Sequence, residues 1–336
     1  MPVAKGIRAL LRRRRLRLER AMARDVTALL DGEAIALLDV GASGGIIPRW
    51  YPHRANIAFT GIEPDQRSIP GLLNSPDARA FRAYEIIPSG AWNVAGPVSI
   101  SFTRKPMCSS HFSPNRPFLS RFPDVERFDL VGSSEIVCQT VDGMFAGSSK
   151  TVDFIKLDLE GGELAVLEGA ATTIGSCLGL HVEAWFQPIR DEQPLFGDIA
   201  GFLRRQGVEF VDFVSLFRWR RDSNDGLSGQ AIFADALFLR SPESVAAPAD
   251  GMPLGTRTAK VYLGILTVYE RFDLALKFLE LLGSHADVLG PGELKRLTGI
   301  IGRRKAHFDR RRRASDFIAR AFTHYAGPNQ SLHQLY

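Results

Sequence analysis

Charged residues are concentrated in one short stretch, Asp153–Glu163, that otherwise has the composition of a buried strand. Lys156, Asp158 and Glu160 alternate with aliphatic residues, so an extended chain places all three charges on one face. Charges on a buried strand are costly unless they are paired or functional. Because open α/β sheets bind ligands at the carboxyl ends of their strands, we expect Asp158 and Glu160 to act on a ligand. Lys156 stays open between a catalytic role and an ion pair that braces the strand.

A second polar strand is expected at Leu178–Phe186, where His181, Glu183 and Trp185 share one face. If this strand lies beside the first, Glu183 comes near Asp158. Such a carboxylate cluster can take a proton from a hydroxyl as a general base, or hold a divalent metal ion through its oxygens. The sequence does not decide which carboxylate is the base or whether a metal is used, and we expect His181 to be a hydrogen-bonded core residue instead.

A glycine-rich turn, Gly41–Gly45, follows the apolar run that ends at Val40, and the next apolar run ends about twenty residues later at Glu63. Glycine lets the backbone approach a ligand closely, and a carboxylate after the second strand suits the two hydroxyls of a ribose. The pair predicts a ligand that contains adenosine.

Spacing and charge decide between two such ligands. The glycines of the turn do not have the G-x-G-x-x-G spacing of a dinucleotide site. Asp39, just before the turn, would repel a pyrophosphate but attract the ammonium and sulfonium groups of S-adenosylmethionine, although it could also cap the turn. We therefore predict S-adenosylmethionine, with a NAD-dependent oxidoreductase as the alternative.

The elements that must position these residues alternate between strands and helices, which predicts an α/β protein with a doubly wound parallel sheet. Helices are expected at 5–31, Leu164–Thr173, Gly197–Gln206, 256–282 and 292–322. Strands are expected at Ile35–Val40, Ile57–Ile62, Ala80–Ile87, Val152–Asp158, Leu178–Phe186, Val208–Leu216 and Asp235–Leu239.

Two further strands, Val98–Thr103 and Ile136–Val141, alternate in the manner of edge strands. The segment at 104–123 between them is rich in Pro, Ser and aromatic residues and is predicted to be a loop over a site. We predict a basic helical N-terminal extension at 1–33, a central domain at 34–242 and a helical C-terminal extension at 253–336, after a linker at 241–255.

Four segments of the sequence resemble the motifs of a known family. DFIKLDLEGGELAVLEGA (153–170), LDVGASGG, GIEPD and HVEAWFQPIRDEQPLFGDI (181–199) are similar to the motifs of the FkbM family of S-adenosylmethionine-dependent methyltransferases. The resemblance covers residues 34–240 and implies a class I methyltransferase fold, a Rossmann-like seven-stranded sheet whose last strand is antiparallel. It also implies O-methylation of a hydroxyl, commonly of a glycan, a glycolipid or a natural-product sugar.

The resemblance also implies roles for individual residues. The cofactor would be held by Asp39, Gly41, Ser43, Gly44 and Glu63. The family's charged motif positions correspond to Lys156, Asp158, Glu160, Glu163 and Glu183.

Composition narrows the class of protein and its partners. The net charge of +5 is concentrated at the ends, with nine Lys or Arg in residues 1–24 and a second basic cluster at 303–313. Such basic ends can make a peripheral contact with an anionic membrane surface through residues 1–24. They also leave a non-catalytic adaptor that docks on a membrane as an alternative function. Nucleic acid is not expected, because no basic and aromatic stacking motif is present. Three widely spaced cysteines and no apolar run of about 20 residues predict a cytoplasmic protein.

Overall fold

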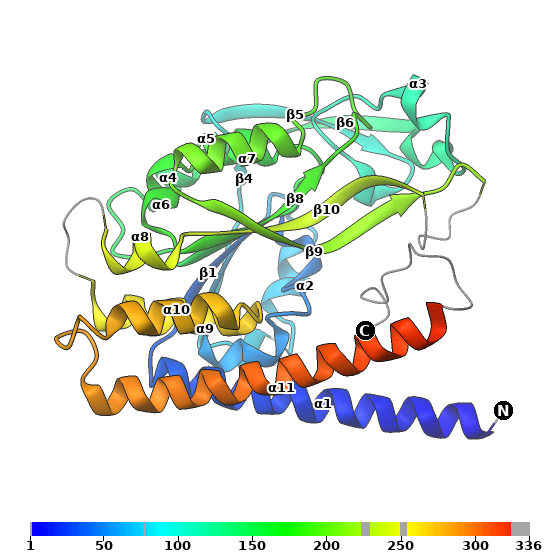
Figure 1. The fold of residues 1–336 in the computed structure, drawn as a ribbon. Helices are drawn as coiled ribbons and strands as arrows, with labels where there is room; N and C mark the ends of the chain where they lie inside the picture. Colours follow the sequence, from blue (N-terminus) through cyan, green and yellow to red (C-terminus); the bar gives the residue numbers. More distant parts are fainter. Residues whose placement is uncertain (1, 77, 223–228, 249–253, 324–336) are drawn as a thin grey trace.

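A seven-stranded sheet forms the centre of the computed structural model, which describes residues 2–76, 78–222, 229–248 and 254–323 (Figure 1). The strand order is β3-β2-β1-β7-β8-β10-β9, parallel from β3 to β8, while β10 runs antiparallel to both of its neighbours. The predicted α/β class is confirmed. The strands are β1 (Ile35–Val40), β2 (Ile57–Ile62), β3 (Ala83–Ile87), β7 (Phe154–Leu157), β8 (Gly179–Trp185), β9 (Glu209–Trp219) and β10 (Gln230–Leu239).

Both faces of the central strands are covered, which explains their nearly continuous apolar sequences. On one face Leu38 and Ile155 pack against a first helical layer; on the other, Leu37 and Phe154 pack against a second. The first layer contains α4 (Val141–Phe145), α5 (Glu163–Glu168), α6 (Ala171–Ser176) and α7 (Phe196–Arg205). The second contains α1 (Pro2–Leu30), α8 (Pro242–Ala246), α9 (Thr256–Val268), α10 (Phe272–Leu282) and α11 (Pro291–Thr323).

Hydrogen bonds join helix α9 to the start of β7, which lies 104 residues earlier in the sequence. Arg257 makes two hydrogen bonds, of 2.7 and 2.8 Å, to the Asp153 carboxylate, which also accepts the Ala36 N–H at 2.7 Å. The hydrogen in place of a side chain at Gly264 leaves room for Leu30 of α1. One core therefore joins the two terminal helical segments to the sheet, and the domain boundaries remain a prediction.

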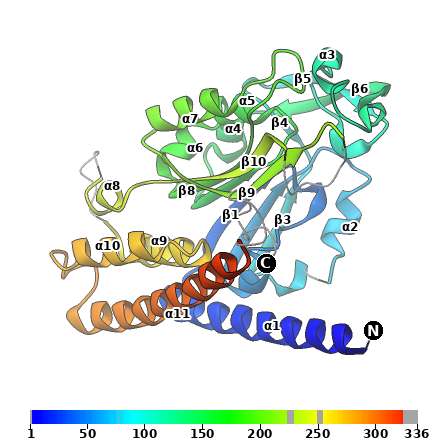
Figure 2. The same ribbon diagram turned by 45° about the vertical axis from the view of Figure 1, so that its right-hand side comes forward.

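Helices α1 and α11 lie side by side and run in opposite directions along one edge of the molecule (Figures 1 and 2). Arg296 of α11 donates to the Ala28 carbonyl at 3.0 Å, and Arg304 pairs with Asp25. No helix in the described part of the chain is long and apolar enough to cross a membrane.

A second, three-stranded sheet carries the residues predicted as edge strands. Its order is β4-β6-β5, with β4 at Gly90–Ala91, β5 at Gly96–Thr103 and β6 at Leu130–Gln139. The edge strand predicted at Val98–Thr103 lies within β5, which is an edge of this second sheet. The one predicted at Ile136–Val141 overlaps β6, which is its central strand, and Val141 begins α4. The segment between β5 and β6 holds a helix, α3 (Arg116–Leu119).

Some helix predictions also need correction. The helix expected at Leu164–Thr173 is two helices, α5 and α6, separated at Gly169, where a β-carbon would lie 2.3 Å from the Trp92 carbonyl oxygen. The region at 256–282 likewise forms two helices, and part of the expected linker forms α8, while its residues 249–253 lie outside the described part of the chain. A short helix, α2 (Ile69–Leu73), follows β2.

Candidate active site

The glycine turn after β1 is held against the turn after β7. Gly41 has a φ of +83°, and a β-carbon there would lie 2.3 Å from the Asp158 carbonyl oxygen. Only glycine tolerates both conditions. Ser43 and Gly44 follow in a single 3₁₀ turn, Ala42–Gly44. The turn predicted to bind the cofactor therefore touches the turn that carries the predicted catalytic carboxylates.

Glu63 lies at the end of β2, beside this turn, and is buried. Burial raises the pKa of its carboxyl group, while backbone N–H groups of Asp65 and Ser43 act against that shift. The Asp65 N–H donates to Oε1 at 2.8 Å. The carboxylate is thus fixed next to the glycine turn, where the sequence predicts a bond to ribose.

Asp39 is paired within the protein. Its carboxylate Oδ1 lies 3.1 Å from the Lys156 ammonium on the adjacent strand, and Lys156 is also 3.4 Å from Asp158. Burial raises the pKa of Asp39 to about 6, and Lys156 opposes that rise. The structure therefore gives Lys156 the ion pair that the sequence left open, and a direct contact of Asp39 with the cofactor remains a prediction.

An apolar pocket opens beside Gly41 and the end of β2. The three-stranded sheet forms its other wall, and His111 of the segment at 104–123 also lines it. An apolar pocket of this kind suits the flat faces of an aromatic ring such as adenine. Its lining is Val40, Gly41, Ile62, Pro64, Gly90, Ala91, Trp92, Val98, Ile100, His111, Ile136, Cys138, Leu159 and Gly162.

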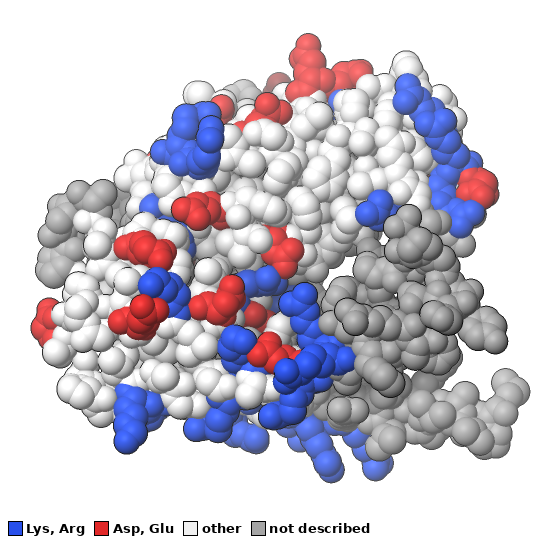
Figure 3. Space-filling view, viewed as in Figure 1, with Lys and Arg blue, Asp and Glu red and all other residues white. Residues whose placement is uncertain are grey.

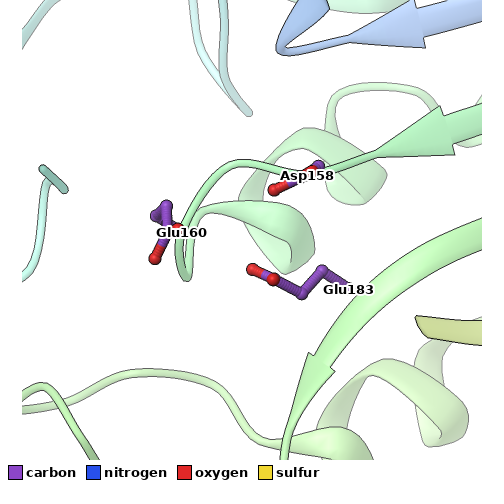
Figure 4. Close-up of side chains that lie close together, drawn as sticks. All are labelled: Asp158, Glu160 and Glu183. Atoms are coloured by element: carbon purple, nitrogen blue, oxygen red, sulfur yellow. The ribbon is translucent and has the colours of Figure 1, made fainter. Parts of the chain in front are cut away.

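Three carboxylates meet at the carboxyl edge of the sheet. One oxygen each of Asp158, Glu160 and Glu183 lies within 4.8 Å of the others, and Figure 4 shows the groups turned toward one another. Asp158 is the exposed member, with 45% of its side chain accessible, whereas Glu183 is buried. The predicted approach of Glu183 to Asp158 is therefore present, because β7 and β8 are neighbours.

Glu160 does not continue the strand, as its alternation with Asp158 suggested. β7 ends at Leu157, and Glu160 lies in a left-handed turn with a φ of +55°. Glu163 closes that turn: its carboxylate accepts the Leu159 N–H at 2.8 Å and the Gly161 N–H at 3.0 Å. Glu163, whose pKa burial raises to about 7, is thus a structural residue that positions Glu160.

Arg190 contacts the carboxylate cluster, although no sequence pattern indicates it as a site residue. It is 1% exposed and donates to Glu160 Oε2 at 2.5 Å, and its guanidinium lies 5.0 Å from the Trp185 ring centroid. The segment at 104–123 reaches the same place, where the Ser110 hydroxyl donates to the Glu160 carbonyl at 2.7 Å. Arg190 lies in the block that resembles the family, which was the one available signal.

His181 is a partnered core residue. Its Nδ1 lies 3.0 Å from the Tyr269 hydroxyl and its Nε2 lies 3.5 Å from Asp235. The Trp50 indole donates to the same hydroxyl at 3.2 Å. Tyr269 directly follows α9, and no sequence pattern indicates that it reaches β8.

The sheet order and the site together define the class of protein. A seven-stranded sheet with one antiparallel strand, and a glycine turn and a carboxylate at the ends of its first two strands, are the features of a class I methyltransferase. Residues 44–210 match the model of the methyltransferase FkbM domain, so the chain is a member of the FkbM methyltransferases. The predicted family is confirmed, and with it S-adenosylmethionine rather than NAD as the cofactor.

Solved structures with similar folds are distant. Magnesium protoporphyrin IX methyltransferase from Synechocystis PCC 6803, with bound SAM, is 10% identical, with a TM-score of 0.35 over 68% of this chain and 81% of that one. The N-methyltransferase NodS from Bradyrhizobium japonicum WM9 is 9% identical, with a TM-score of 0.32 over 67% of this chain and 96% of that one. Comparison with curated proteins finds no match.

Proposed function

We propose that this methyltransferase transfers the methyl group of S-adenosylmethionine to a hydroxyl oxygen of a sugar, in a glycan, a glycolipid or a natural product. The observation that carries the proposal is the carboxylate cluster of Asp158, Glu160 and Glu183, which adjoins the glycine turn predicted to bind the cofactor. A hydroxyl must lose its proton when it is methylated, and a carboxylate within reach can accept that proton.

The reaction needs alignment and a base. The hydroxyl oxygen attacks the methyl carbon as the carbon–sulfur bond breaks, which leaves S-adenosylhomocysteine, and the proton passes to a carboxylate. Asp158 is the proposed base, because it is the exposed member of the cluster and its backbone touches the cofactor turn.

Polar groups around the cluster support a sugar as the acceptor. Trp185 Nε1, Arg190 Nη1 and both amide atoms of Gln193 are buried and make no hydrogen bond within the described residues. Trp185 shares a strand face with Glu183, and Gln193 lies against the Gly161 turn. Buried donors beside an aromatic ring suit a compound that carries several hydroxyl groups.

The test uses S-adenosylmethionine with a tritiated methyl group and a cell extract rich in glycans and glycolipids. We expect label in methyl ethers, which resist alkaline hydrolysis, and a loss of about 100-fold or more in rate for Asp158→Asn, the usual range for a general base. Binding of S-adenosylhomocysteine by the variant should persist. Label in alkali-labile esters or in amines, or full activity of the variant, contradicts the proposal.

We also propose that the basic surface made by α1 and α11 contacts an anionic membrane. Figure 3 shows Lys and Arg side chains gathered along the edge where these two helices lie. The support is the charge itself: the basic surface consists of the exposed residues Arg13, Arg17, Arg20, Arg24, Arg303, Arg310, Arg311, Arg312 and Arg313.

A further inference from the structure

Glu183 is the least compensated charge in the site. It is 7% exposed, and its Oε2 is buried without a hydrogen-bond partner among the described residues. The carboxylates of Asp158 and Glu160 each bring one oxygen within 4.8 Å of an oxygen of Glu183. A buried carboxylate beside two other carboxylates is unstable unless a proton or a cation joins it.

The other two carboxylates do have cations beside them. Lys156 lies 3.4 Å from Asp158, and Arg190 lies 2.5 Å from Glu160. Neither of these cations forms a salt bridge with Glu183 in the structure. Two positive side chains thus face three acids, and the excess negative charge lies where Glu183 points toward the other two (Figure 4).

The spacing of the oxygens fits an ion. Mg²⁺ and Ca²⁺ bind oxygen ligands at about 2.0–2.6 Å, so two ligands on one ion lie at most about 4–5 Å apart. The three carboxylate oxygens lie within 4.8 Å of one another. Because all three are carboxylates, without sulfur or imidazole, the set favours a hard divalent cation over zinc or copper.

We propose that Asp158, Glu160 and Glu183 bind one divalent cation of the Mg²⁺ or Mn²⁺ type at the acceptor end of the active site. Glu183 supplies the buried ligand, and Asp158 supplies the ligand on the open side. Arg190 and the Glu163 carboxylate, which hold the Glu160 turn, are positioning residues for this site.

This inference deepens the proposed function and rests on it for its chemical role. A bound cation polarises a hydroxyl oxygen that coordinates it and makes proton loss easier. The acceptor hydroxyl would then lie between the ion and the cofactor turn, with Asp158 next to both.

Metal binding is measured without any methyl acceptor, so its outcome is independent of the proposed reaction. Mn²⁺ is titrated into the full chain and the free ion is followed by electron paramagnetic resonance, with Mg²⁺ as the competitor. We expect one Mn²⁺ per chain with a Kd below about 1 mM. We expect Glu183→Gln and Asp158→Asn each to weaken Mn²⁺ binding about tenfold or more.

The matched control is Glu135→Gln, which removes an exposed carboxylate from β6 and should leave Mn²⁺ binding unchanged. Thermal unfolding and calorimetry with S-adenosylhomocysteine report whether each variant is folded and retains its cofactor site. The proposal is overturned if wild-type protein binds no Mn²⁺ saturably, or if both cluster variants bind it as the wild type does. A saturable site without methyl transfer would overturn the proposed function and leave the metal site standing.

Discussion

At the residue scale, the site depends on the close approach of two turns, and Gly41 is where they meet. Its backbone is in the left-handed region, and the Asp158 carbonyl fills the space that a side chain would need. Because this carbonyl belongs to the backbone, it cannot move aside without distorting the turn after β7. A substitution at Gly41 should therefore disturb both the glycine turn after β1 and the turn after β7 that carries Asp158.

For Gly41→Ala we expect a loss of about 1–3 kcal/mol in the free energy of unfolding, from the strained φ and the collision. Calorimetry should show S-adenosylhomocysteine binding weakened about tenfold or more. Gly197→Ala in α7 is the control, because its β-carbon would meet nothing within 4 Å and its φ is not positive. If both variants had the same stability and the same affinity for S-adenosylhomocysteine, the close approach of the two turns at Gly41 would be contradicted.

At the element scale, short helices of the first layer depend on side chains from other elements. Asp142 of α4 accepts N–H groups from Thr172 at 2.9 Å and from Thr173 at 2.8 Å, at the start of α6. Burial acts to raise the pKa of this carboxyl group, but the threonine hydrogen bonds outweigh it, and the pKa lies below its ordinary 3.8. A carboxylate at a helix N-terminus is stabilising by about 1 kcal/mol.

The sign of this shift predicts a pH dependence for Asp142→Asn. The pKa of Asp142 is lower in the folded than in the unfolded state, so the ionised carboxylate stabilises the protein above about pH 4. This stabilisation is lost as the pH falls through the pKa that Asp142 has in the folded protein. The stability difference between wild type and variant, measured in urea, should shrink from pH 6 to pH 3. A difference that stays constant or grows on acidification would mean that the carboxylate is not stabilised at α6.

Elements made by local patterns were predictable from the sequence, whereas those set by distant contacts were not. The apolar runs gave β1 and β2 with the observed ends, and alternation gave the shared face of His181 and Glu183. The break at Gly169 and the second sheet depend on Trp92 and on strand pairing, which no periodicity reports. Arg190 and Tyr269 reach the site strands from segments outside them, so only the fold reveals them.

At the scale of the whole molecule, the two basic ends of the chain come together. They are almost 300 residues apart in the sequence, yet α1 and α11 are antiparallel neighbours (Figure 2). Arg304 is neutralised by Asp25, while the arginines of the basic surface face solvent. The charge is thus presented on one side of the molecule rather than on two separate tails.

Vesicles that contain phosphatidylserine should bind the protein through this side. Each basic residue near such a membrane contributes about 1 kcal/mol, so Arg310→Glu with Arg313→Glu should weaken vesicle binding about tenfold or more. Binding should also fall as salt is raised. Arg204→Glu with Arg205→Glu on α7 makes the same charge change elsewhere on the surface and is the control. Equal binding by both double variants would remove the membrane proposal.

The central claim is that the turn after β1 and Glu63 bind the methyl donor, and calorimetry tests it most directly. We predict that wild-type protein binds one S-adenosylhomocysteine per chain and binds no NAD under the same conditions. Glu63→Ala should weaken S-adenosylhomocysteine binding about tenfold or more, since hydrogen bonds to a charged group contribute about 1.5–3 kcal/mol. Tighter binding of NAD than of S-adenosylhomocysteine, or binding that is unchanged in Glu63→Ala, would contradict this account.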